Sequence, residues 1–157
     1  MNKYNKIQSI MEDMINFFAE FAAILQSKIE AINQNDVTKL EDIMKQEQAF
    51  SMKVRGLEKS REAAMAQAGL NAQQFKDIVN SPQSENEEEL AKVYFLLKEK
   101  LDEYTNLSEV VKAQVELRLH SIKMILERLE NNTANAIYDK SGADAAKQAD
   151  GFKPTKV

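Results

Sequence analysis

Apolar residues recur at spacings of three and four along residues 5–32, and this period predicts a long amphipathic α-helix. Ile10, Phe17 and Ile24 widen the apolar stripe to roughly half of the helix circumference at 100° per residue. A face that wide meets two neighbours, so we expect this helix at the centre of a bundle. The stripe itself consists of Ile7, Met11, Met14, Phe18, Phe21, Leu25, Ile29 and Ile32.

A second long helix follows the polar run at residues 33–36, where Asn35 or Asp36 can cap it by accepting a free backbone N–H. Its apolar side runs from residue 40 to residue 68, and Gly69 is a normal residue for its end. Gly56 lies inside this helix and costs it about 1 kcal/mol relative to alanine, which suggests a bend or a close helix crossing.

A short third helix is predicted over residues 70–79, capped by Asn71 and ended by the Ser81-Pro82 pair. The pattern at residues 84–87 is a capping box, and it predicts the start of the last helix. From there the three-four spacing continues to Leu129, roughly 47 residues or about 70 Å, against roughly 45 Å for the first helix. We expect this helix either to extend beyond its neighbours or to break at Ser108, and to stop at residues 131–133.

These elements predict an all-α fold, an antiparallel bundle of three long helices and one short helix with a flexible C-terminal tail. Residues 1–132 are the predicted helical bundle, and residues 133–157 are the tail. Too few large apolar side chains follow residue 132 to offset the entropy of ordering it, so we expect the tail to be mobile. The predicted bundle centre contains Phe18, Phe21, Leu25, Leu40, Met44, Leu97 and Leu101.

Composition and charge bear on whether the protein binds nucleic acid, crosses a membrane or lies in a reducing compartment. The net charge of −4 and pI near 5.2 argue against binding nucleic acid, since neutralising phosphates needs a basic face. The chain has no cysteine, which fits a reducing compartment, and its start lacks the pattern of a signal peptide. No stretch approaches 18 consecutive apolar residues, so membrane insertion is not expected. The prediction is a cytoplasmic protein.

Convergent reactive groups are scarce. His120 is the only histidine and has no partner at metal-ligand spacing, so it is expected to be a partly exposed helix residue. The acidic run at residues 85–89 lacks the spacing and the glycine of a calcium loop. There is no glycine-rich phosphate loop and no nucleophile elbow. We therefore expect no enzyme activity, no cofactor and no metal site.

The C-terminal part of the last helix is unusually apolar, over more than half of its circumference. An apolar area wider than a two-helix seam needs usually marks an interface. Met124 adds an adaptable side chain, which suits a surface that binds more than one sequence. The predicted binding residues are Val111, Val115, Leu119, Ile122, Met124, Leu126 and Leu129.

The order of these segments resembles the FlgN family of flagellar export chaperones. The resemblance rests on the long first helix, the polar turn at residues 33–36 with the following residues 37–41, and the turn at residues 68–70. It also rests on the long last helix and on the segment at residues 136–142, which is similar to the family's tail signature, a Tyr followed after three residues by Gly.

The resemblance implies that the clients are hook-associated junction proteins, whose disordered, helix-prone ends would be covered by the apolar residues of the last helix. It further implies that the tail docks on the flagellar export gate through Ile137, Tyr138 and Gly142. The alternative from another class is a structural coiled-coil protein that forms a homodimer through the last helix, which explains the heptad spacing equally well. An apolar seam without paired carboxylates or histidines gives little support to a third class, a helical enzyme or metal carrier.

Overall fold

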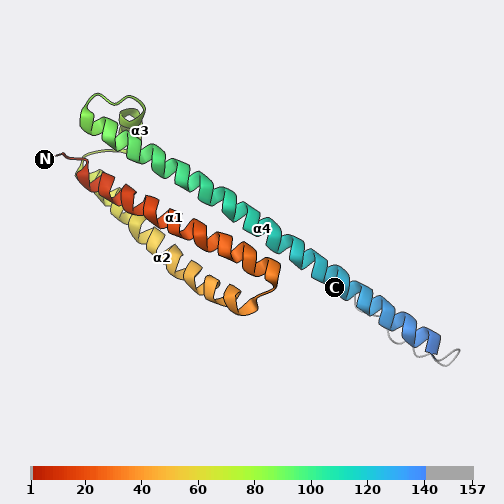
Figure 1. Ribbon diagram of the computed structural model, residues 1–157. Coiled ribbons are helices and arrows are strands. Elements are labelled where there is room, and N and C mark those ends of the chain that lie inside the picture. The colour runs from red at the N-terminus through yellow and green to blue at the C-terminus, as the bar shows by residue number, and fades with distance from the viewer. Residues whose placement is uncertain (1, 141–157) are drawn as a thin grey trace. The chain divides into compact units, whose positions relative to one another are not determined.

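Four α-helices make up the computed structural model, which describes the backbone of residues 2–140 and the side chains of residues 2–135 (Figure 1). They are α1 (Asn5–Gln34), α2 (Val37–Gln67), α3 (Ala72–Asn80) and α4 (Glu85–Lys140). No strand occurs within the described residues, so the predicted all-α class is confirmed. The chain divides into two compact units, residues 1–112 and residues 113–157, and the division falls inside α4.

The first unit is built on an antiparallel pair, α1 and α2, which lie side by side (Figure 1). Asn35 ends α1 in the left-handed conformation at φ 55°, a conformation that asparagine adopts more readily than most residues. Asp36 then caps α2, because its carboxylate accepts a hydrogen bond from the Lys39 backbone N–H at 3.1 Å. Of the two residues predicted as candidates for this cap, Asp36 therefore caps α2, whereas Asn35 ends α1.

Asn71 and Ser84 cap α3 and α4 as the sequence predicts, but the capping box predicted at residues 84–87 forms only in part. Asn71 forms a capping box with Gln74, in which the Gln74 backbone N–H donates to the Asn71 side-chain oxygen at 2.8 Å. At the start of α4, the Ser84 hydroxyl accepts from the Glu87 backbone N–H at 3.2 Å. The Glu87 carboxylate instead accepts from the Gln83 backbone N–H and from the Tyr4 hydroxyl, which ties the start of α4 to the start of α1.

An aromatic cluster forms the centre of the first unit. Phe50 of α2 stacks on Phe21 of α1 with ring centroids 3.4 Å apart, and it stacks on Phe17 at 4.3 Å. Tyr104 brings α4 against both helices, 5.4 Å from Phe18 and 5.8 Å from Phe50. Since Tyr4 meets Glu87 and Phe18 meets Tyr104, α4 runs in the same direction as α1 and opposite to α2.

Four of the seven residues predicted for the bundle centre are buried, and two are half-buried. Phe18, Phe21, Leu25 and Leu97 are buried, whereas Leu40 and Leu101 are partly exposed. The prediction for Met44 is wrong, because its side chain is 57% exposed. The buried face of α2 passes through Ile43 and Phe50, seven residues apart, and Met44 is turned about 100° away from Ile43.

α4 is one unbroken helix of 56 residues, so the break considered at Ser108 does not occur. The predicted stop at residues 131–133 is also wrong, because α4 continues to Lys140. Thr133 is accommodated within the helix by donating its hydroxyl to the Leu129 carbonyl oxygen at 2.8 Å. Asparagine and threonine lower helix propensity only modestly, and nothing at these positions forces the backbone out of the helix.

Gly56 lies within α2 and Gly69 just after its end, and the two glycines differ in backbone conformation. A side chain added at Gly56 would meet nothing within 4 Å, so the close helix crossing suggested by the sequence is absent there. Gly69 has φ 71°, in the left-handed region, and its backbone N–H closes the end of α2 on the Ala66 carbonyl.

Gly56→Ala is therefore expected to raise the free energy of unfolding by about 0.5 to 1 kcal/mol, because alanine removes the entropic cost of glycine in a helix without a clash. The matched control, Gly69→Ala, is expected to lower it by about 1 kcal/mol, because alanine is strained at that φ. Urea unfolding of both variants measures the two effects. A loss of stability in Gly56→Ala would show that the glycine is needed for the path of α2.

Candidate functional site: an exposed apolar stripe on α4

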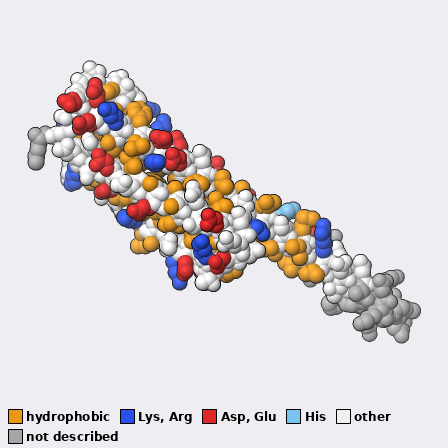
Figure 2. All heavy atoms as spheres, viewed as in Figure 1, with side chains coloured by type: hydrophobic (Ala, Val, Ile, Leu, Met, Phe, Trp, Pro, Cys, Tyr) orange, Lys and Arg blue, Asp and Glu red, His pale blue; other side chains and the backbone are white. Residues whose placement is uncertain are grey.

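In the second unit, large apolar side chains of α4 lie open to solvent. Six of them have exposed fractions between 54% and 61%, and the seventh, Met124, is 44% exposed. Figure 2 shows hydrophobic side chains at the surface of this part of the helix, with Lys and Arg side chains among them. These seven residues are Leu117, Leu119, Ile122, Met124, Ile125, Leu126 and Leu129.

Helix geometry sorts these residues onto two faces. At 100° per residue, one set spans an arc of roughly 120° centred near Ile122 and Leu129. Leu117 and Met124, seven residues apart, lie together on the opposite side of the helix. We call this first set, together with the half-exposed Val115 on the same face, the α4 stripe. It consists of Val115, Leu119, Ile122, Ile125, Leu126 and Leu129.

Five of the seven residues predicted to bind a client belong to this stripe. Val111, the first of the predicted set, is only 5% exposed and belongs to the core of the first unit. Met124 lies on the opposite face, so one partner helix cannot cover it together with Ile122. Ile125 was missing from the predicted set, although it lies three residues from Ile122 on the stripe.

Ile137 and Tyr138, predicted for docking, belong to the last turns of α4, where the structure describes the backbone alone. Gly142 lies outside the described residues, as does the remainder of the predicted tail from residue 141 onward. The docking role of these three residues stays a prediction.

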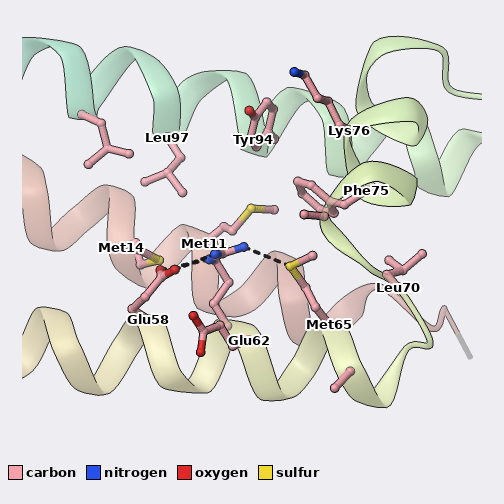
Figure 3. A pocket seen from close by; sticks show the side chains of 14 residues that line it. Met11, Met14, Glu58, Glu62, Met65, Leu70, Phe75, Lys76, Tyr94 and Leu97 are labelled. Atoms are coloured by element: carbon pink, nitrogen blue, oxygen red, sulfur yellow. Dashed lines mark hydrogen bonds and ion pairs between the residues drawn. The ribbon is translucent and has the colours of Figure 1, made fainter.

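The first unit contains an open pocket of about 710 Å³ at its α3 end (Figure 3). Met11 of α1, Met65 of α2 and Phe75 of α3 line it together with Tyr94 and Leu97 of α4. Arg61 is one of the charged side chains that line the pocket, and its Nε donates to Glu58 at 3.0 Å while its Nη1 donates to the Met65 sulfur at 3.0 Å. This group was not predicted from the sequence, although Glu58, Arg61 and Met65 follow one another at spacings of three and four residues along one face of α2.

The Glu58–Arg61 pair shifts the ionisation of both groups. Two hydrogen bonds from the Arg61 guanidinium lower the pKa of the Glu58 carboxyl below its usual value of 4.5. The same hydrogen bonds raise the pKa of Arg61. Because the pKa of Glu58 is lower in the folded chain, the pair stabilises the fold above the ordinary carboxyl pKa, and this stabilisation is lost as the pH falls through the folded-state value.

Glu58→Gln is expected to lower the free energy of unfolding at pH 7 by no more than about 0.5 kcal/mol, because Glu58 is 41% exposed and the pair is an i, i+3 pair on a helix. The difference between the variant and the wild type should disappear when the pH is brought below the folded-state pKa of Glu58. Urea unfolding at pH 7 and at acidic pH measures both quantities. A difference that persists in acid would show that the carboxylate charge is not its source.

His120 is exposed on α4, as predicted. Within the described part of the chain, no three His, Cys, Asp or Glu side chains gather where they could hold a metal ion. Among residues 2–140, no helix combines the length and the apolar character needed to cross a bilayer.

Comparison with known families adds one result. The sequence model of the family described as FlgN protein matches residues 1–146, which covers both units and nearly all of the chain. No curated protein and no solved structure matches the chain.

Proposed function

The chain belongs to the FlgN family of flagellar export chaperones, and we propose that its α4 stripe holds the helix-prone ends of hook-associated junction proteins before their export. The family is one of chaperones and not of enzymes. The observation that carries the proposal is the exposure of the stripe, since Ile122, Leu126 and Leu129 are each more than half exposed on a helix with apolar heptad spacing.

The chemistry of the stripe suits a client that is unfolded when free. An amphipathic segment without a partner cannot bury its apolar face, so it stays disordered and is prone to aggregate. A helix that offers Ile122, Leu126 and Leu129 at spacings of four and three residues gives such a segment a surface on which to fold. Holding clients in this way in the cytoplasm would prevent their aggregation before secretion.

The holding function is tested by capturing the full chain, with an affinity tag, from the cytoplasm of a flagellated cell and identifying the retained proteins by mass. Hook-associated proteins are expected in the eluate. Recovery of the chain with a second copy of itself and with no flagellar protein would instead support the homodimer that the heptad spacing also allows.

We assign delivery of the client to the export gate to the segment that follows the stripe. Tyr138 is the aromatic residue of this segment, and it lies within residues 1–146, which match the FlgN family model. Tyr138→Ala is expected to leave the client dissociation constant within a few-fold of wild type. An aromatic anchor at an interface contributes about 2 kcal/mol or more, so binding to the export gate should weaken about thirtyfold or more, and secretion should fall.

Two measurements on the Tyr138→Ala strain decide this assignment: the amount of hook-associated protein secreted, and the client affinity of the purified variant. Secretion at the wild-type level would remove Tyr138 from docking. A loss of client affinity with gate binding intact would move Tyr138 into the holding surface.

A further inference from the structure

In the first unit, one face of α4 packs against two helices at once. The Tyr104 ring lies 5.7 Å from Phe21 of α1 and 5.8 Å from Phe50 of α2, measured between ring centroids. Leu97 of the same face is buried, and it lines the pocket that α1, α2 and α3 form with α4. The antiparallel α1–α2 pair therefore packs on this face of α4 at Tyr104.

The α4 stripe continues this same face into the second unit. Counted at 100° per residue along the helix, Ile122 has the angular position of Tyr104, and Leu126 that of Leu90. Leu90 is fully buried, whereas Leu126 is 54% exposed. The face that packs against a helix pair at Tyr104 is thus more than half exposed at Ile122 and Leu126.

We propose that the partner segment which covers the α4 stripe is a helical hairpin, two antiparallel amphipathic helices of one hook-associated protein, packed as α1 and α2 pack upstream. This inference rests on the proposed function for the identity of the partner. The number of helices comes from the continuity of the α4 face with the interface already formed in the first unit.

The width of the stripe supports two helices over one. Ile125 lies on one edge of the arc, and Leu119 and Leu126 lie on the other, roughly 100° to 120° away around the helix. A two-stranded coiled coil covers only the narrower seam of its a and d positions. One partner helix centred on Ile122 would leave both edges of the arc partly exposed, whereas a hairpin places one helix against each edge.

A second copy of this chain fits the surface less well. Its own hairpin, α1–α2, is already covered by its own α4 through Tyr104 and Leu97, so it has no free helix pair to offer. The stripe of a second copy would contribute one helix, and the edge positions would remain uncovered. The hairpin must therefore come from a different chain.

Site-directed photo-crosslinking tests the proposal, because the chain contains no cysteine and single cysteines can be labelled uniquely. Leu119→Cys and Ile125→Cys place a benzophenone maleimide on the two edges of the stripe, and Leu117→Cys places it on the opposite face as a control. Each labelled full-length chain is mixed with the hook-associated protein that the wild-type chain retains, then irradiated, digested and analysed by mass.

The two edge positions are expected to attach to two separate helical segments of one partner molecule, and Leu117→Cys to neither. Attachment of both edges to a single segment overturns the hairpin, and attachment to this chain itself assigns the face to a second copy. Failure of both edge positions to attach, with the partner still retained, removes the hairpin from the stripe. A wild-type chain that retains no hook-associated protein refutes the proposed function instead.

A second measurement does not depend on the label. A peptide that contains both crosslinked segments of the partner, joined as in the partner, should bind the wild-type chain at least tenfold more tightly than a peptide of either segment alone. Equal affinity for one segment and for the pair would overturn the hairpin.

Discussion

Replacing Phe21 by alanine is expected to lower the free energy of unfolding by about 3 to 5 kcal/mol, the range for a well-packed buried aromatic. Phe21 is 2% exposed and stacks on Phe50, and its ring also lies 5.7 Å from Tyr104. The truncation would therefore leave a cavity where all three long helices meet. Since a domain is typically stable by about 5 to 15 kcal/mol, this single change removes a large part of the total.

Urea unfolding followed by circular dichroism measures the loss, and Phe95→Ala is the matched control. Phe95 carries the same ring but is 46% exposed on α4, so its truncation should cost clearly less. Equal stabilities for Phe21→Ala and the wild type would contradict the packing of Phe21 against α2 and α4.

The double variant Ile122→Ser with Leu126→Ser is expected to lose client binding. Both side chains are more than half exposed in the free chain, so replacing them should change helicity and stability little. At the interface, buried aliphatic anchors of about 2 kcal/mol each would together reduce affinity on the order of a thousandfold. Isothermal titration with the retained hook-associated protein measures the change.

The control for this variant is Leu117→Ser with Met124→Ser, which makes the same chemical change on the opposite face of α4. Its client affinity should stay within a few-fold of wild type. Equal losses in the two double variants would show that the client surrounds α4, and Met124 would then belong to the binding surface as the sequence predicts. Unfolding of the first variant would place Ile122 and Leu126 in the chain's own core.

The period of apolar residues was sufficient to predict the four helices and most of the core, because helix position and burial both follow from amphipathicity. The caps at Asp36, Asn71 and Ser84 were predictable for a different reason: each side chain binds a backbone N–H only three residues away, so the interaction is local in sequence. The end of α4 was not, because the low helix propensity of residues 131–133 costs little per residue and does not terminate a helix by itself.

Whether a side chain points into the core or toward solvent was harder to predict than the helix to which its residue belongs. Met44 follows Ile43 in the sequence but lies about 100° away around the helix, and only the packing of Phe50 against α1 shows which of the two points inward. Val111 has the same heptad position as residues of the α4 stripe, so its burial depends on the extent of the first unit, which is a tertiary property. The pairing of Arg61 with Glu58 and Met65 likewise becomes visible once the pocket is formed.

The most direct test of α4 as the holding surface is hydrogen exchange of the full chain, measured with and without its hook-associated protein. A solvent-exposed helix exchanges its amides rapidly when nothing packs on it, and a bound partner slows that exchange. Binding on the stripe predicts strong new protection of residues 115–129, with the α1–α2 pair unchanged. Protection confined to the pocket lined by Met65 and Phe75, with residues 115–129 exchanging as in the free chain, would contradict it.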